Sequence, residues 1–233
     1  MLLKALREEV LEANLELVRR GLVLYTFGNA SGISRSDGFV AIKPSGVPYE
    51  KLAASDIVIS DLEGRIVDGS LRPSSDLPTH LALYRHFPEI GGVAHTHSEF
   101  ATAWCQAQRA IPCLGTTHAD YFHGPVPVTS PLTQAEIEGE YERETGEAIC
   151  KALGHADPLS TPAVLVAGHA PFCWGTTPAE AAHMAVVLES IARMAWYTLL
   201  IRPDAPPLSA NLRQKHFGRK HGPNAYYGQD RSK

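Results

Sequence analysis

The sequence predicts an α/β or α+β sandwich, in which helices cover a mixed β-sheet. Long segments with apolar residues at helical spacing alternate with short β-type runs, and Gly, Pro and Asp turns separate them. The chain has 233 residues, 44% of them hydrophobic, which is enough for a full core. No repeat, low-complexity tract or linker interrupts it, so residues 1–233 are predicted to form a single domain.

Five helices are predicted from apolar spacing and from signals at their ends. The first covers 2–20, and Gly21 follows it as a C-cap. Ser75 or Asp76 caps the second, which tolerates Pro78 in its first turn and continues to Phe87. The other three have start signals at Ser98 and at two capping boxes. They are predicted to run from Ser98 to about Ala107, from Thr133-x-x-Glu136 to Gly154, and from Thr177-Pro178-x-Glu180 to Leu200.

Five strands are predicted between these helices. The first three are short and bounded by turn residues, the fourth carries two histidines, and the fifth is a buried apolar run. They are Phe39–Ile42, Ile57–Ser60, Arg65–Val67, Gly92–His97 and Ala163–Ala167.

Charge and hydropathy argue against nucleic-acid and membrane functions. The formal net charge is −4, and one short basic run near the end of the chain is interpreted as a solvated face or a local anion site. That run contains Arg213, Lys215, Arg219 and Lys220. No apolar stretch approaches the ~20 residues that span a bilayer. The first 20 residues alternate charge with Leu and Val, unlike a signal peptide.

The four cysteines lie inside apolar segments and form no C-x-x-C pair. They are Cys105, Cys113, Cys150 and Cys173. Buried free thiols are the interpretation, and a reducing, cytoplasmic location follows from it.

The pair His95-Thr96-His97 is the sharpest local feature. Side chains alternate faces along a strand, so both imidazoles would point to the same side and could ligate one divalent ion. His169 follows the buried strand 163–167, and Asp76 could add a carboxylate. Three His with an optional carboxylate suit Zn²⁺, although Mn²⁺ or Co²⁺ could occupy such a site. With eleven histidines in the chain, a chance pair is the alternative, and His80 competes with Asp76 for the same helix face.

Three small-residue segments are candidates for an anion pocket. They are Gly28-Asn29-Ala30-Ser31-Gly32, Lys43-Pro44-Ser45-Gly46 and Pro73-Ser74-Ser75-Asp76. Small residues let backbone N–H groups approach an anion, and the Ser hydroxyls and Lys43 add donors and charge. None matches a Walker loop or a dinucleotide fingerprint, and each such segment alone is more often just a turn. Together they suggest a phosphate pocket beside the metal.

Taken together, these segments resemble the class II aldolase and sugar-phosphate epimerase superfamily, and within it the L-ribulose-5-phosphate 4-epimerases. The matching stretches cover nearly the whole chain. They are GNASG (28–32), IKPSGV (42–47), PSSDLPTH (73–80), HTHS (95–98), GTTHADYF (115–122), GEYERETG (139–146) and KHGPNAYYGQ (220–229). The resemblance implies a central, mostly antiparallel sheet flanked by helices, in the class II aldolase arrangement.

The resemblance also implies roles for individual residues. His95, His97 and His169 correspond to zinc ligands, with Asp76 as a loosely held fourth. Asp120 and Tyr227 correspond to the catalytic acid/base pair. Residues expected to bind the substrate and its phosphate, or to lie near that site, are Gly28, Asn29, Lys43, Ser45, Gly46, Ser74, Ser75, Thr116, Glu142 and His216.

The function that this implies is interconversion of L-ribulose 5-phosphate and D-xylulose 5-phosphate by cleavage and re-formation of the C3–C4 bond. A homotetramer with active sites between subunits is implied as well. Asp76 stands where aldolases of the superfamily have Glu, which favours the epimerase branch. The alternatives are a sugar-phosphate aldolase or lyase, a 4-epimerase of an ascorbate or xylulose pathway, and a non-catalytic scaffold. The same fold occurs in cytoskeletal adaptor proteins, which typically lack the metal-binding histidines that this chain has.

Overall fold

The computed structural model describes residues 1–222 and 225–228, and its strands form one seven-stranded sheet. The sheet order is β4-β3-β2-β1-β5-β7-β6, and every pair of neighbouring strands is antiparallel. The strands are β1 (Asn29–Ser34), β2 (Phe39–Ile42), β3 (Val58–Asp61), β4 (Ile66–Asp68), β5 (Gly92–His95), β6 (Ala163–Leu165) and β7 (Pro171–Gly175). Within the described residues, an isolated Val128–Leu165 bridge adds a parallel contact. The predicted fold class is confirmed.

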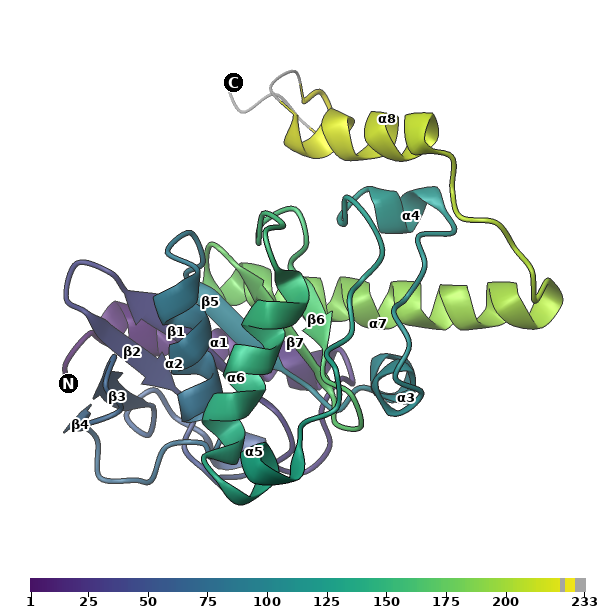
Figure 1. The fold of residues 1–233 in the computed structure, drawn as a ribbon. Helices are drawn as coiled ribbons and strands as arrows, with labels where there is room; N and C mark the ends of the chain where they lie inside the picture. Colours follow the sequence, from purple (N-terminus) through teal and green to yellow (C-terminus); the bar gives the residue numbers. More distant parts are fainter. Residues whose placement is uncertain (223–224, 229–233) are drawn as a thin grey trace.

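Helices cover both faces of this sheet (Figure 1). One layer contains α2 and α6, which pack against each other, and the other contains α1 and α7. The helices are α1 (Lys4–Arg19), α2 (Leu77–His86), α3 (Glu99–Gln106), α4 (Thr116–Ala119), α5 (Gln134–Glu138), α6 (Tyr141–Leu153), α7 (Pro178–Ile201) and α8 (Ala210–His221), with a 3₁₀ turn η1 (Tyr49–Lys51). Helix α8 lies beside α4, away from the sheet.

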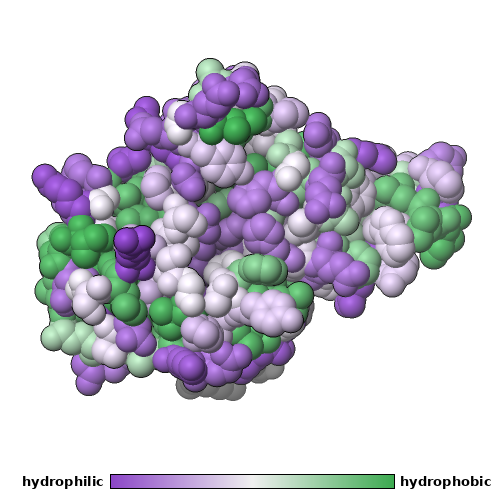
Figure 2. Space-filling view, turned by 90° about the horizontal axis from the view of Figure 1, so that it is seen from below, coloured by the Kyte–Doolittle hydropathy of each residue, from purple (hydrophilic) through white to green (hydrophobic). Residues whose placement is uncertain are grey.

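The long helix α7 is half buried and half projecting. Its N-terminal part packs on β5 and β7, whereas its last turns extend beyond the sheet (Figure 1). Hydrophobic side chains are exposed at this projecting end, which lies at the right of Figure 2. They include Trp196, Tyr197, Leu200 and Ile201. By length and composition α7 could cross a membrane, but a core helix passes the same test, and ten residues of α7 are buried.

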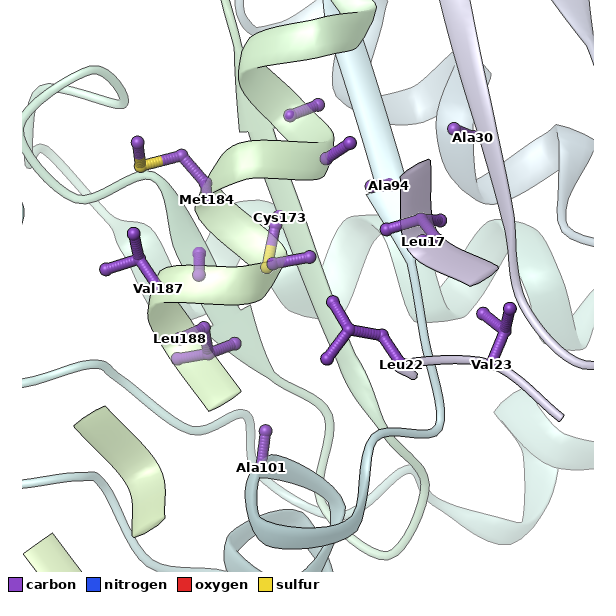
Figure 3. Close-up of a cluster of buried hydrophobic side chains, with 14 of the residues drawn as sticks. Leu17, Leu22, Val23, Ala30, Ala94, Ala101, Cys173, Met184, Val187 and Leu188 are labelled. Atoms are coloured by element: carbon purple, nitrogen blue, oxygen red, sulfur yellow. The ribbon is translucent and has the colours of Figure 1, made fainter. Parts of the chain in front are cut away.

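The main core lies between the sheet and the α1/α7 layer (Figure 3). Leu17 of α1 and Leu188 of α7 belong to one buried cluster with Ala30 of β1 and Ala94 of β5, and Leu17 lies beside Ala94 in Figure 3. Burying a Leu side chain of this kind contributes ~1.5–3 kcal/mol. A second cluster on the other face joins Leu81 of α2 to residues of β2, β3 and β7. The four cysteines are buried and unpaired, as predicted.

The helix-end signals were mostly correct. Gly21 adopts φ +69° directly after Arg20, the C-cap of α1. Asp76 occupies the N-cap position of α2, but its side chain makes no capping hydrogen bond. The Thr133 capping box is formed in both directions. The Thr177 box is not reciprocal: the Thr177 hydroxyl accepts from the Glu180 N–H, but the Glu180 carboxylate accepts from Thr176.

Other predictions were wrong in detail. The helix expected from Thr133 to Gly154 is two helices, because the backbone turns at Gly139 (φ −88°, ψ −132°). Strand β5 ends at His95, so His97 lies outside it. Strands β1 and β7 and helices α4 and α8 were not predicted. The segment 28–32 is therefore a turn only at Gly28 (φ +74°), and Asn29 begins a central strand.

Candidate metal centre and substrate cavity

Three imidazoles converge where the central strands end. His95 is the last residue of β5, His97 follows two residues later, and His169 lies in the turn between β6 and β7. Antiparallel pairing sets His95 opposite Phe172, which brings the His169 turn next to the end of β5. One potential ligand atom of each histidine lies within 4.8 Å of the other two.

Hydrogen bonding fixes which nitrogen His95 presents. Its Nδ1 lies 3.0 Å from the Pro171 carbonyl oxygen, so Nδ1–H donates there and the Nε2 lone pair faces the cluster. The Nε2 atoms of His95 and His97 are 3.1 Å apart. Two nitrogens bound tetrahedrally to one Zn²⁺ at ~2.0–2.1 Å would be about 3.3 Å apart. The buried Nδ1 of His169 has no hydrogen-bond partner among the described residues. The donor set and its spacing therefore fit a divalent cation.

The protonation states also suit ligation. Burial lowers the pKa of His95 to about 4, and burial lowers the pKa of His97 and of His169 as well. A histidine must be neutral to donate its lone pair to a metal ion. At neutral pH the three rings are therefore prepared as ligands rather than as cations.

Asp76 lines the same cavity but stands apart from the three-histidine cluster. Its Oδ2 accepts a 2.6 Å hydrogen bond from Asn29 Nδ2. Burial acts to raise the pKa of Asp76, but the nearby His95 and His80 rings and the Asn29 bond outweigh it, and the net pKa is lowered. The side chain is thus an oriented carboxylate at the edge of the metal centre. His80, the predicted competitor, lies outside the cluster because its Nδ1 is bonded to Ser31 Oγ.

A polar cavity of about 340 Å³ connects the histidines to all three anion-binding candidates. Its lining residues are Thr26, Phe27, Gly28, Asn29, Lys43, Pro44, Ser45, Gly46, Ser74, Ser75, Asp76, His95, His97 and His169. The Lys43 side chain is buried, and burial lowers its pKa. Its Nζ lies 4.7 Å from the Tyr49 ring centre and 3.3 Å from the Pro44 oxygen. Lys43 is therefore a partly desolvated cation directed at a cavity suited to an anion.

Gly28 holds this arrangement together. A Cβ built on it would lie 2.6 Å from the His95 carbonyl oxygen, so the loop and the ligand strand touch through their backbones. The Tyr49 hydroxyl donates to the Gly28 carbonyl at 2.9 Å and fixes the loop from the other side. A glycine is required here both by the close approach and by φ +74°.

Asp120 and Tyr227 are not brought to this cavity within one chain. Asp120 follows α4, and its carboxylate bonds Arg219 (2.7 Å) and His216 (2.9 Å) of α8. Burial would raise the Asp120 pKa, but those bonds lower it. The Tyr227 ring is 61% exposed and lies over the Arg219 guanidinium at 5.1 Å. Thr116 is the first residue of α4, and His216 lies in α8. Four of the predicted residues therefore form a separate cluster of α4 and α8, namely Thr116, Asp120, His216 and Tyr227.

Glu142 occupies an intermediate position. It lies in the first turn of α6 and lines no wall of the cavity. Its neighbour Tyr141 has its ring 6.4 Å from the His169 ring. The start of α6 therefore borders the metal centre, although the Glu142 side chain is not part of it.

Several residues at the site were missed by sequence reasoning. The Phe172 ring stacks on His95 with centroids 4.2 Å apart, and Phe27 lies 6.2 Å from His97. Phe27 precedes the first glycine segment, so its position beside that motif was an available signal. For Phe172 the signal was weaker, since only the antiparallel return of β7 places it against His95.

Comparison with known proteins identifies the family and agrees with the fold. A profile described as the class II aldolase and adducin N-terminal domain matches residues 8–196. Among solved structures, an L-fuculose 1-phosphate aldolase superposes with a TM-score of 0.79 at 24% identity, over 91% of this chain and 94% of that one. YgbL of Escherichia coli, a candidate aldolase/epimerase/decarboxylase, gives 0.73 at 27% identity over 91% and 97%. The L-fuculose-1-phosphate aldolase of Thermus thermophilus gives 0.67 at 25% over 86% and 99%.

Proposed function

Because the chain belongs to the class II aldolase and adducin family, we propose that it is a divalent-metal enzyme acting on a carbon–carbon bond of a sugar phosphate. One observation carries the proposal: three imidazole nitrogens, the Asp76 carboxylate and the Lys43 ammonium meet around one cavity. A non-catalytic scaffold would not need neutral, converging histidines beside a buried lysine. Zn²⁺ is the expected ion, with Mn²⁺ or Co²⁺ as substitutes for the same donors.

Within the family, we propose L-ribulose-5-phosphate 4-epimerase activity. C4 of the pentulose is not adjacent to the C2 carbonyl, so its proton is not acidic and direct deprotonation cannot invert it. Cleavage of C3–C4 gives an enediolate and glycolaldehyde phosphate, and re-addition to the other aldehyde face inverts C4. A bound divalent cation supplies Lewis-acid stabilisation of the negative charge that develops on the sugar oxygens.

Epimerisation requires the aldehyde fragment to stay bound between cleavage and re-addition, and the protein's own residues would hold it. The aldehyde fragment carries the phosphate, and Lys43 with the 45–46 and 74–75 loops would hold that phosphate while the aldehyde rotates. Asn29 keeps Asp76 oriented through its 2.6 Å bond. If the phosphate were not held, the aldehyde would leave and the net reaction would become an aldol cleavage.

We propose that Asp120 and Tyr227 act on the cavity of a neighbouring subunit in a homotetramer. Both residues lie in the α4–α8 cluster and line no wall of the cavity in their own chain. Asp120, kept ionised by Arg219 and His216, is suited to accept a proton, and the exposed Tyr227 hydroxyl to donate one. The exposed apolar end of α7 supports an assembly, since such patches favour protein contacts.

A sugar-phosphate aldolase is the second candidate. The likeness to the Thermus L-fuculose-1-phosphate aldolase favours it, whereas Asp76 in place of Glu favours the epimerase. The description of YgbL covers both activities. The buried free thiols are consistent with action in the cytoplasm, where thiols stay reduced.

The product of zinc-loaded protein with L-ribulose 5-phosphate decides between these candidates. We expect D-xylulose 5-phosphate with little free glycolaldehyde phosphate, and loss of turnover in a chelator-treated sample. The Lys43→Gln variant is a matched test of retention, because it removes the cation but keeps a polar side chain. It should release a larger share of aldehyde. Accumulation of aldehyde by the unaltered protein would identify an aldolase, and no turnover with zinc bound would contradict the substrate.

A further inference from the structure

A line of three buried polar side chains lies behind the metal cavity, between β1 and α2. The Tyr84 hydroxyl lies 2.8 Å from Ser31 Oγ, which lies 2.7 Å from His80 Nδ1. All three residues have an exposed fraction of 0%. The far nitrogen of the last ring, His80 Nε2, is buried and has no partner among the described residues. An unsatisfied buried group of this kind costs ~1–3 kcal/mol, so its retention calls for a physical reason.

Counting protons along this line assigns the His80 tautomer. If Tyr84 donates to Ser31 and Ser31 donates to Nδ1, both hydroxyl protons are used and the imidazole proton lies on Nε2. In the reverse direction Nδ1–H donates to Ser31 and Ser31 donates to Tyr84. The Tyr84 proton then has no acceptor among the described residues, and Nε2 is an orphan as well. The first arrangement leaves fewer unsatisfied groups, so His80 carries its proton on Nε2.

His80 and Asp76 lie near each other at the start of α2, and no residue that the structure describes bonds His80 Nε2. His80 lies one helical turn after Asp76, and its backbone N–H donates to the Asp76 carbonyl at 3.1 Å. Burial lowers the pKa of His80 to about 3, and the nearby Asp76 carboxylate offsets part of that shift. The His80 ring meets the edge of Phe172 at 5.8 Å, and Phe172 stacks on His95. His80 thus stands behind both the carboxylate and a predicted metal ligand.

We propose that His80 is a positioning residue of the metal centre, whose Nε2–H donates to the Asp76 carboxylate when a divalent cation is bound. The inference rests on the proposed metal centre. Asn29 holds one carboxylate oxygen, Oδ2, and Oδ1 makes no hydrogen bond among the described residues. With a donor on each side, the carboxylate keeps one face towards the three histidines. Such outer partners of metal ligands typically contribute 10–100-fold in metal affinity.

Two substitutions at His80 distinguish the roles of its two ring nitrogens. A Gln amide nitrogen reaches the position of Nε2, whereas an Asn amide reaches only that of Nδ1. Zn²⁺ affinity of the full chain is measured by competition with a chromogenic chelator, without any sugar present. We expect His80→Asn to weaken Zn²⁺ binding by ~10–100-fold, and His80→Gln to retain most of the affinity. Ser31→Ala, which removes the donor to Nδ1, should weaken binding in the same direction and serves if His80→Asn does not fold.

A double-mutant cycle with Asp76→Asn distinguishes positioning from general structural damage. If His80 acts through Asp76, His80→Asn should cause no further loss of Zn²⁺ affinity in the Asp76→Asn background. An equal loss in both backgrounds, or unchanged affinity in His80→Asn alone, would overturn the role of His80 and leave the metal centre intact. Absence of Zn²⁺ binding by the unaltered protein would instead contradict the proposed function itself.

Discussion

Replacing Gly28 with Ala tests whether the loop and the ligand strand are held in register by backbone contact. Alanine at φ +74° costs ~1–2 kcal/mol, because the left-handed region crowds Cβ. The new Cβ would also lie 2.6 Å from the His95 carbonyl oxygen and 3.3 Å from Thr96 Cα. Neither backbone atom can rotate away, and forced overpacking costs a further ~1–3 kcal/mol. We expect a total loss of ~2–5 kcal/mol in unfolding free energy.

Gly21→Ala is the matched control for backbone strain. Gly21 has φ +69°, and a Cβ there would meet nothing within 4 Å. It should lose only the ~1–2 kcal/mol of the left-handed conformation and should leave metal binding unchanged. Urea unfolding of the metal-free proteins and Zn²⁺ competition measure the two effects. The Gly28 variant should bind Zn²⁺ at least about tenfold more weakly, because His95 must shift. If the two variants lost equal stability and bound Zn²⁺ with equal affinity, the close backbone contact between Gly28 and His95 would be refuted.

Three further outcomes are expected. His97→Asn should lower the zinc content of the purified protein, since two imidazoles remain, and full zinc occupancy would contradict its role as a ligand. Tyr227→Phe should keep the metal but lose most epimerisation, by ~10²–10⁴-fold, and full activity would remove that role. Burial lowers the pKa of His80 to about 3 and of His118 to about 4. Both rings are neutral in the fold, so the unfolded chain binds protons first as the pH falls below about 6.5. Stability of the metal-free protein should therefore decrease from pH 6.5 towards pH 4, by up to ~1.4 kcal/mol per pH unit for each ring. A flat urea-midpoint profile in this range would contradict their burial as neutral groups.

Much of the fold was accessible from the sequence, because periodicity and caps are local. Residues 2–20 and 39–42 were placed to within two residues of α1 and β2. Strand β1 was missed because Asn29–Ser34 contains small residues and a single β-branched one, Ile33. Its pairing with β2 and β5 is decided by tertiary contact, and small side chains there let α1 and α7 approach. Strand β7 begins with Pro171, which locally indicates a turn.

The candidate site was predictable for a different reason. His95, Lys43 and Asp76 lie in three separate segments, and the set of motifs predicts that they meet at one site. In the structure all three residues line one cavity, although β5 stops before His97. The pairing of Asp120 with Arg219, 99 residues apart, could not be inferred from either segment. The orphan nitrogen of His80 could not either, because it depends on which side chains the fold packs around the ring.

X-ray absorption spectroscopy of the zinc-loaded protein tests the central claim most directly. The account predicts a shell of three imidazole nitrogens with oxygen completing it, at ~2.0–2.2 Å, and loss of one imidazole contribution in His97→Asn. The chain also holds four buried thiols that could compete for zinc if the account were wrong. A sulfur shell at ~2.3 Å, or an oxygen shell without imidazole, would contradict a metal centre built from His95, His97 and His169.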